Sequence, residues 1–519
     1  MVQSSWMQRL TGILLGAAIG GLAAIALLWA VASLSWPFGF DQGAFAWVGD
    51  VILRGGVPYL DAFDVKGPMS FLPSAAVMAV AGRNWWGIRV FDLMLVSGMV
   101  VTIVQLGRRY SSWTIAVAAA LLWVLGYANV GYQFTAQPDG WMLWLLLFPL
   151  APLSLGDAPL RRQYLMLAGV AAGLAAMLKP FYVIFLVIPL ALVWRNERED
   201  GHRWAPCVLV LMAALAPIAL LVGWLALHPA LQAFWEAYVR FNLVKNSQAM
   251  SGAASEALSY GLVRDAFVLL FLPLAAAGVA ALRTEHSRGA LVWGLWLALA
   301  LPLVLVQRPY YPYRLLILSP VLAILAAAAF GAIAASVRQA PSFRAVSTVF
   351  GLGLLSLGGI VLARYPLGEG LRWVKLASGR LSADDYYARY HQLSGTALDE
   401  RLVSRRLAAI SSPGDVVFAW NYPAVAVLAN RRLLPRLSIG TPTEPTLPAA
   451  VREPYLDELR ATLDKTPPDF VIAEDRLGRE GACLSCLPPF SQLGASGEAL
   501  AAPYRLVFRS GTLVMYRRE

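Results

Sequence analysis

Residues 11–33 have the sequence TGILLGAAIGGLAAIALLWAVAS, an apolar run in which no side chain is charged. A helix needs about 20 such residues to cross the hydrocarbon core of a bilayer, so this run is long enough to span one. It follows Arg9 and is too long for the apolar core of a typical cleaved signal peptide, although Ala44-Phe45-Ala46 has the form of a cleavage site. We therefore expect a retained transmembrane helix near the start of the chain.

Further apolar runs recur as far as residue 363. Hydrophobic residues make up 58% of the 519 residues and charged residues 14%, against about 45–50% and 25% in ordinary soluble domains. This composition excludes a simple soluble protein and predicts a polytopic α-helical membrane protein of about 11 transmembrane helices. Besides 11–33, the runs lie near 86–106, 112–128, 140–156, 164–179, 181–194, 204–226, 265–282, 289–306, 315–336 and 345–363.

Arginines mark alternate gaps between the runs. The positive-inside rule predicts that these gaps and the N-terminus are cytoplasmic, and an odd number of spans then places the end of the chain outside the cytoplasm. Merging the two short runs around Lys179-Pro180 into one re-entrant element would change this parity, but the arginines on both sides argue against merging. The arginines of these gaps are Arg108 and Arg109, Arg161 and Arg162, Arg195, Arg198 and Arg203, Arg283 and Arg288, and Arg338 and Arg344.

The same arginines contribute to the net charge of +11, which in a soluble protein would suggest nucleic acid as a partner. No basic stripe with interleaved aromatic residues stands out in the charged C-terminal part, so nucleic-acid binding is not expected.

Residues 364–519 differ from the rest of the chain, because 37 of the 73 charged residues lie there. The pattern predicts a helix over 399–412, strands over 415–420 and 469–474, and a hairpin over 504–518 that turns at Ser510-Gly511. We therefore expect two domains, a transmembrane domain of residues 1–363 and a soluble α/β domain of residues 364–519. Cys483 and Cys486 form a single CLSC pair, which favours a disulfide or two thiols over a zinc site.

The first outer loop, residues 34–85, concentrates polar residues between two spans. Its segment DQGAFAWVGDVILRGGVPYLDAFDVKGPMSFL, residues 41–72, contains four aspartates, Arg54 and Lys66. Asp41 follows the first span directly, where a carboxylate at the water–membrane boundary can act as a base on an amphiphilic substrate. Alternatively, Asp41 caps a helix that begins near Gly43. The residues alone do not choose between these interpretations.

This loop resembles the GT-C membrane glycosyltransferases of the protein O-mannosyltransferase and aminoarabinose-transferase group. The resemblance rests on Asp41, Gly55, Pro58-Tyr59 and the DVKGP turn of residues 64–68. It extends to Arg89, to Gln137-Pro138-Asp139 and to the segment RPYYPYRLLILSP at 308–320. It covers the membrane domain well and the C-terminal residues only loosely.

The resemblance implies an inverting glycosyltransferase in a bacterial inner membrane. Such an enzyme moves a sugar from a polyprenyl-phosphate carrier to a glycolipid, lipopolysaccharide or polysaccharide acceptor on the periplasmic face. By position in the motif, Asp41 would be the general base and Lys66 would hold the donor phosphate, while Asp139 would line the same cavity as a second catalytic residue. The other residues implied to bind substrate are Tyr59, Asp64, Arg89, Arg308, Tyr313 and Arg314.

The resemblance implies no firmly bound cofactor. Several relatives carry a second carboxylate close to the first Asp, whereas Gln42 and Gly43 follow Asp41 here, which argues against a divalent metal at this motif. The aminoarabinose transferases have a Glu-Lys-Pro-Pro turn where this chain has Asp64-Val65-Lys66-Gly67-Pro68, so the match of Lys66 depends on the two turns being equivalent.

Two alternatives of other classes remain at this point. A transporter or flippase for a lipid-linked sugar would fit the many spans, but the chain shows no persuasive internal repeat, and its charges cluster in outer loops instead of mid-span. A non-catalytic relative that binds a glycolipid would fit as well. Lys179, an ionisable residue between two apolar runs, is a functional candidate in any of these classes.

Overall fold

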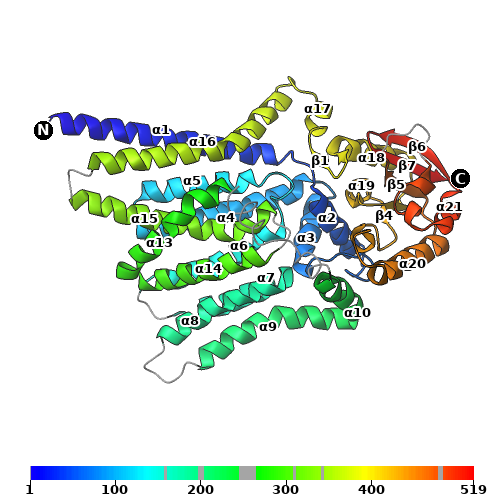
Figure 1. Cartoon of the computed structure of the whole chain (residues 1–519), viewed down its shortest axis with the longest axis horizontal. Coiled ribbons are helices and arrows are strands. Elements are labelled where there is room, and N and C mark those ends of the chain that lie inside the picture. The colour runs from blue at the N-terminus through cyan, green and yellow to red at the C-terminus, as the bar shows by residue number, and fades with distance from the viewer. Residues whose placement is uncertain are drawn as a thin grey trace. The chain divides into compact units, whose positions relative to one another are not determined.

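The computed structural model describes residues 2–156, 160–196, 204–244, 265–307, 311–339, 344–476 and 483–519 (Figure 1). The chain forms two compact units, each assembled from three separate segments. Unit 1 comprises residues 1–34, 90–221 and 249–374, and unit 2 comprises residues 35–89, 222–248 and 375–519. The predicted division at residue 363 into a membrane domain and a periplasmic domain stays a prediction.

Unit 1 is helical in the residues that the structure describes, and three of its helices, α4, α9 and α16, continue into unit 2. Its elements are α1 (Val2–Ser33), α4 (Trp86–Tyr110), α5 (Trp113–Asn129), α6 (Pro138–Ser154), α7 (Arg162–Leu178), η2 (Pro180–Leu186), α8 (Val187–Asn196), α9 (Trp204–Leu227), α13 (Ala266–Glu285), α14 (Ser287–Val306), η5 (Pro312–Leu318), α15 (Ser319–Gln339) and α16 (Arg344–Ala377).

The predicted apolar runs lie on these helices, with 181–194 divided between η2 and α8 and 315–336 divided between η5 and α15, so the predicted polytopic helical architecture is confirmed. Six helical segments in the described part of the chain are long and apolar enough to cross a membrane, and the total of about 11 spans stays a prediction. The six are Gly12–Ser33, Trp86–Tyr110, Trp204–Leu227, Ala266–Glu285, Ser287–Leu305 and Pro312–Ser336.

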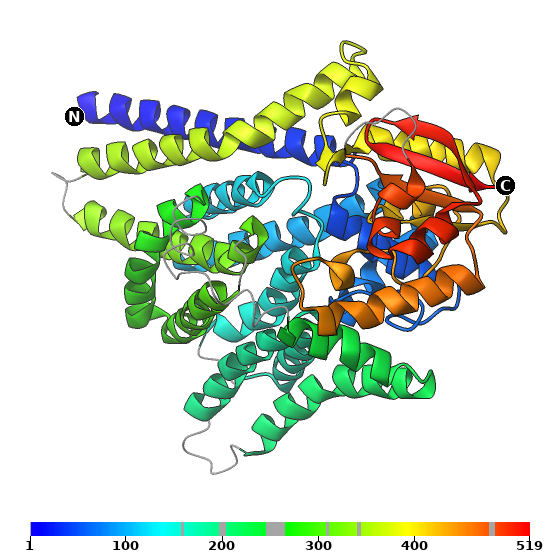
Figure 2. The same cartoon turned by 45° about the vertical axis from the view of Figure 1, so that its right-hand side comes forward.

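Small residues let the helices of unit 1 approach closely. Gly169 and Gly173 of α7 are spaced four residues apart, and a Cβ atom on either would overlap a backbone carbonyl of α9. This is the small-xxx-small pattern that brings helix backbones together in membranes. Helices α1 and α16 also run side by side (Figures 1 and 2), where Gly359 lies against Leu22.

Unit 2 combines a five-stranded mixed sheet with short helices. The strand order is β4-β3-β5-β7-β6, with β3 parallel to both of its neighbours and β7 antiparallel to both of its own. The elements are α2 (Phe40–Leu53), η1 (Pro68–Ser70), α3 (Leu72–Ala81), α10 (Leu231–Phe234), η3 (Trp235–Arg240), α17 (Ala383–Tyr387), β1 (His391–Gln392), β2 (Gly395–Thr396), α18 (Ala397–Ile410), β3 (Val416–Ala419), α19 (Pro423–Leu428), β4 (Arg432–Leu433), η7 (Thr441–Thr443), α20 (Ala449–Lys465), β5 (Phe470–Glu474), η8 (Leu484–Cys486), η9 (Phe490–Gln492), α21 (Ala495–Ala501), β6 (Tyr504–Ser510) and β7 (Leu513–Arg518).

The predicted α/β character of the C-terminal residues is confirmed. Helix α18, strands β3 and β5 and the β6–β7 hairpin all lie where the sequence pattern places them. The hairpin turn contains Gly511, whose φ of +51° is a conformation that glycine adopts without the strain of a Cβ atom.

The loop of residues 34–85 and the C-terminal residues share one core within unit 2. Gly43 of α2 lies so close to α19 that a Cβ atom would be 3.0 Å from the Cβ of Ala424. Farther along the loop, the Phe63 amide donates to the Arg436 carbonyl at 2.9 Å, and the Phe63 ring meets the Tyr455 ring edge-on at 5.3 Å between centroids. The loop is therefore a packed part of unit 2.

A buried carboxyl of α18 makes the stability of the protein depend on pH. Burial, together with the charge of neighbouring Asp399, raises the pKa of Glu400 to about 8. Its pKa in the unfolded chain is about 4.3, so between these values the folded state holds a proton that the unfolded state lacks. The free energy of unfolding then falls as pH rises from about 5 to about 8, by up to about 1.4 kcal/mol per pH unit.

We expect Glu400→Gln to remove this slope, because a neutral amide oxygen still accepts the 3.0 Å hydrogen bond from Gln392 without titrating. Thermal unfolding of the purified protein at pH 5, 6.5 and 8 measures the effect. The variant should match the wild type at pH 5 and exceed it at pH 8, whereas Glu453→Gln, at an exposed carboxylate, should keep the wild-type slope. Parallel pH profiles for Glu400→Gln and the wild type would contradict the prediction.

Candidate active site

Helix α2 places Asp41 in its first turn. The helix begins at Phe40, and the Gln42 side chain accepts a hydrogen bond from the backbone amide of Gly39 at 2.7 Å. The expected alternative, in which Asp41 caps a helix starting near Gly43, is wrong, because Gly39 is the N-cap and Gln42 supplies the side-chain oxygen. The Asp41 carboxylate is thereby left for other partners, in a turn where the helix dipole favours negative charge.

Asp41 faces Lys66, the lysine that the resemblance implies to hold the donor phosphate. Its Oδ2 lies 3.5 Å from Lys66 Nζ, and the two side chains are 27% and 31% exposed, respectively. Both groups therefore remain accessible to a ligand while they stay within electrostatic reach of each other. The structure brings together the carboxylate and the lysine that are 25 residues apart in the sequence.

The turn that carries Lys66 is held by Asp64 and Tyr59. The Asp64 carboxylate accepts a hydrogen bond of 2.8 Å from the backbone amide of Lys66. The buried Tyr59 hydroxyl donates a hydrogen bond of 2.8 Å to the Lys66 carbonyl. Burial raises the pKa of Asp64 to about 6, against the lowering effect of the Lys66 charge. Tyr59 has a positive φ of 69°, an uncommon conformation for a bulky residue, at the head of this turn. Both residues thus position Lys66, and direct contact of either with substrate stays a prediction.

Arg89 holds the start of α2 from inside the protein. It is 1% exposed, and its Nη2 donates to the Pro37 carbonyl at 2.7 Å and to Gln42 Oε1 at 2.8 Å. The guanidinium also lies over the Trp36 ring, 5.6 Å from its centroid. The geometry supports a positioning role for Arg89 behind Asp41, whereas its predicted contact with substrate is untested.

Arg89→Met separates these two roles. Removing the guanidinium leaves the buried Pro37 carbonyl without this donor, which costs about 1–3 kcal/mol of stability. It also loosens the turn that carries Asp41. We expect a lower melting temperature and a lower kcat with little change in KM for the donor. A raised donor KM with an unchanged melting temperature would instead show substrate contact. Arg83→Met serves as the control, since Arg83 pairs with Asp50 at 2.6 Å in the same unit.

A second polar cluster lies in unit 1, around Asp139 in the first turn of α6. Asp139 Oδ1 accepts hydrogen bonds from Lys179 Nζ and, at 3.1 Å, from the hydroxyl of Tyr182. The Asp139 side chain is 6% exposed and the Lys179 side chain 19%. Lys179 occupies the extended residue between α7 and η2, where Pro180 starts the next element. The helix break therefore places the lysine beside the aspartate.

Aromatic rings at the start of η5 lie beside this ion pair. Lys179 Nζ lies 5.2 Å from the centroid of the Tyr313 ring, which stacks on Tyr311 at 5.5 Å. Arg314 extends over the same two rings, with its guanidinium carbon 5.5 and 5.9 Å from their centroids. Such cation–ring contacts stabilise charges in a partly desolvated site. The predicted residues Asp139, Tyr313 and Arg314 are thus close neighbours in unit 1.

The structure adds two residues that the sequence analysis did not select, Tyr182 and Gln307, whose Oε1 lies 3.4 Å from Lys179 Nζ. No sequence pattern singles out Tyr182 from the other boundary aromatics, and Gln307 only adjoins the tyrosine-rich segment. Lys179 itself was selected from the sequence, because it is an ionisable residue between two apolar runs. Arg308, also predicted to bind substrate, lies outside the described residues. Asp41 belongs to unit 2 and Asp139 to unit 1, so their sharing one cavity stays a prediction.

Comparisons with known proteins agree with this architecture. Residues 65–224, which include Lys66, Asp139 and Lys179, match the family model of dolichyl-phosphate-mannose-protein mannosyltransferase. No curated protein sequence matches the chain. The fold is that of the GT-C membrane glycosyltransferases, and the resemblance to the protein O-mannosyltransferase and aminoarabinose-transferase group is confirmed.

Among solved structures, the chain is similar in fold to ArnT from Cupriavidus metallidurans. Its crystal structure bound to undecaprenyl phosphate superimposes with a TM-score of 0.61 at 15% sequence identity, covering 95% of this chain and 97% of that chain. Its apo crystal structure superimposes with a TM-score of 0.58 at 15% identity, covering 99% of this chain and 98% of that chain. The likeness spans the C-terminal α/β region as well as the helices.

Proposed function

We propose that the protein is an inverting glycosyltransferase that takes a sugar from a polyprenyl-phosphate carrier and transfers it to an acceptor on the periplasmic face of the inner membrane. The observation that carries the proposal is the pair of Asp41 and Lys66, a carboxylate and an ammonium 3.5 Å apart and both partly exposed. The family match of residues 65–224 and the binding of undecaprenyl phosphate by ArnT support the choice of donor.

The pair supplies the two charges that the reaction needs. The acceptor hydroxyl gives its proton to the Asp41 carboxylate as its oxygen bonds to the anomeric carbon of the donor sugar. The bond from that carbon to the phosphate oxygen breaks on the opposite face, which inverts the configuration and releases polyprenyl phosphate. Lys66 stabilises the negative charge that grows on the leaving phosphate. Binding of the donor phosphate by Lys66 also weakens its pairing with Asp41 and leaves the carboxylate ready to accept the proton.

The supporting residues have separate tasks in this proposal. Asp64 and Tyr59 fix the turn of Lys66, and Arg89 fixes the helix start of Asp41. Asp139 and Lys179, with Tyr313 of η5, form the second polar cluster of the enzyme and are proposed to bind the donor or the acceptor.

The test is a transfer assay with the purified full-length protein in lipid. Polyprenyl-phosphate sugars of several kinds are offered with extracted membrane glycolipids, and released polyprenyl phosphate and any mass gain on an acceptor are measured. With one of the donors, we expect the amount of polyprenyl phosphate released to equal the amount of sugar transferred to an acceptor. Donor binding without turnover under any acceptor would favour a glycolipid-binding protein, and neither binding nor turnover would favour a transporter.

The proposed orientation has its own test. Cys483 is exposed in unit 2, and Cys207 lies in α9. A thiol reagent that does not cross membranes should therefore label Cys483 in intact spheroplasts if the C-terminal residues are periplasmic. Labelling of Cys483 only after the membrane is opened would place these residues in the cytoplasm and invert the topology. Because Cys486 is exposed as well, the Cys483→Ser/Cys486→Ser variant assigns the label to this segment.

A further inference from the structure

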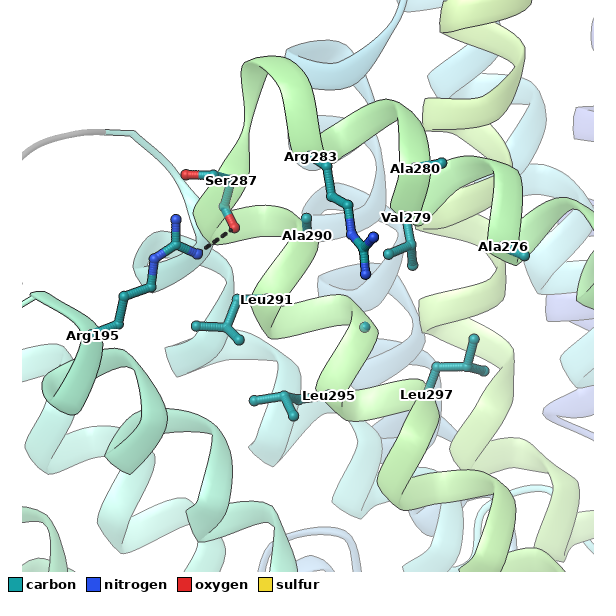
Figure 3. Close-up of a pocket in the computed structure, with 11 residues that line it drawn as sticks. Arg195, Ala276, Val279, Ala280, Arg283, Ser287, Ala290, Leu291, Leu295 and Leu297 are labelled. Atoms are coloured by element: carbon teal, nitrogen blue, oxygen red, sulfur yellow. Dashed lines mark hydrogen bonds between the residues drawn. The ribbon is translucent and has the colours of Figure 1, made fainter.

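A cavity of about 790 Å³ lies within unit 1, between α8, α13 and α14 (Figure 3). Apolar side chains form much of its wall, among them Val279 of α13 and Leu291, Leu295 and Leu297 of α14. The volume lies in the range of about 300–1,000 Å³ that is usual for cavities that bind small molecules. None of its lining residues belongs to the polar cluster of Asp139 and Lys179.

Two arginines line the same cavity, Arg195 at the end of α8 and Arg283 near the end of α13 (Figure 3). Arg195 donates to the Ser287 carbonyl at 3.1 Å, and Arg283 extends alongside Val279. No acidic residue is among the described lining residues. The cavity therefore combines two cationic groups with an apolar surface.

We propose that this cavity binds an anionic glycerophospholipid, with its phosphate between Arg195 and Arg283 and part of an acyl chain against the leucines of α14. Guanidinium groups bind phosphate oxygens through paired hydrogen bonds, and basic pockets between transmembrane helices are a recurrent form of anionic-lipid site. The apolar walls match an acyl chain and would contribute nothing to the binding of free phosphate. The arginine distribution predicts that this end of the helices is cytoplasmic, where anionic lipids are abundant.

Gly294 offers a way to fill the cavity without changing its charge. It lines the cavity from α14, and a Cβ atom on it would meet only the two methyl groups of Val279, at 3.7 and 3.9 Å, among the described residues. A Cβ atom therefore fits at this position, and the longer side chain of Gly294→Leu is expected to enter the space proposed for the acyl chain. Gly353 of α16, which has no described neighbour within 4 Å of such a Cβ, gives the matched control Gly353→Leu.

The experiment measures lipid retention by native mass spectrometry. Delipidated full-length protein is titrated with phosphatidylglycerol, with phosphatidylcholine and with undecaprenyl phosphate. The expected result is selective retention of phosphatidylglycerol. Arg195→Gln/Arg283→Gln should weaken it about thirtyfold, five- to sixfold for each arginine. Gly294→Leu should weaken it as well. Gly353→Leu and Arg161→Gln/Arg162→Gln, which changes two exposed arginines at the start of α7, should leave it unchanged.

Three outcomes would overturn the proposal. These are equal retention of phosphatidylglycerol and phosphatidylcholine, retention that is unaffected in both cavity variants, and preferential retention of undecaprenyl phosphate that the cavity variants abolish. The last would make the cavity a second carrier site. Because the readout is lipid mass, the test does not depend on turnover or on the proposed transferase activity.

Discussion

Asp41→Asn is expected to lower the rate of polyprenyl-phosphate release by about 10²- to 10⁴-fold, the usual contribution of a general base. Asparagine keeps the shape of the side chain and its place in the first turn of α2, but it cannot accept the proton of the acceptor hydroxyl. The pair with Lys66 is partly exposed, and such pairs contribute only about 0–1 kcal/mol to stability. The melting temperature should therefore stay close to that of the wild type.

A measurement of donor affinity distinguishes loss of the general base from loss of the donor-binding site. Lys66 keeps its charge in Asp41→Asn, so the polyprenyl-phosphate sugar should bind at least as tightly as to the wild type. Asp457→Asn controls for the removal of a carboxylate, because Asp457 is 66% exposed on α20 and belongs to the same unit. Wild-type turnover by Asp41→Asn would remove Asp41 as the base and, with it, the proposed equivalence of the opening loop to that of the GT-C group.

The sequence predicted the elements well where local chemistry marks their ends. Helix α7 ends at Leu178 because Lys179 and Pro180 interrupt the apolar run, and the β6–β7 hairpin turns at a glycine. The cap of α2 was missed because Gly39 has no side chain with which to signal it. The side-chain oxygen that accepts the Gly39 amide hydrogen bond belongs to Gln42, which lies inside the helix.

Contacts between segments that are distant in the sequence could not be predicted, because no local sequence pattern marks them. Arg436 donates to the Tyr59 carbonyl at 2.9 Å across 377 residues of sequence, and this contact joins the first loop to the C-terminal residues in unit 2. The Asp41–Lys66 pair was predictable only through the family resemblance, because neither residue alone indicates a partner. Lys179 was recognised as unusual from its apolar surroundings, but its pairing with Asp139 depends on how α6 and α7 pack.

Neutralising either member of the Asp139–Lys179 pair alone should reduce both stability and turnover strongly. The pair is largely buried, and removing one partner from a buried ion pair costs about 3–5 kcal/mol because the other charge stays uncompensated. Asp139→Asn and Lys179→Met should each lower the melting temperature. The double variant should recover much of that loss, since it leaves no unpaired charge, and the recovery measures the coupling between the two residues.

Turnover in the double variant then distinguishes a catalytic pair from a structural one. If the charges act on the substrate, Asp139→Asn/Lys179→Met stays inactive although its stability has recovered. Asp475→Asn is the structural control, because Asp475 is buried and pairs with Arg509 at 2.6 Å in unit 2, so it should lower stability and leave kcat of the folded protein unchanged. Recovery of both stability and turnover in the double variant would show that Asp139 and Lys179 have only a structural role, in the packing of α6 and α7. Proton transfer and phosphate stabilisation would then rest on Asp41 and Lys66.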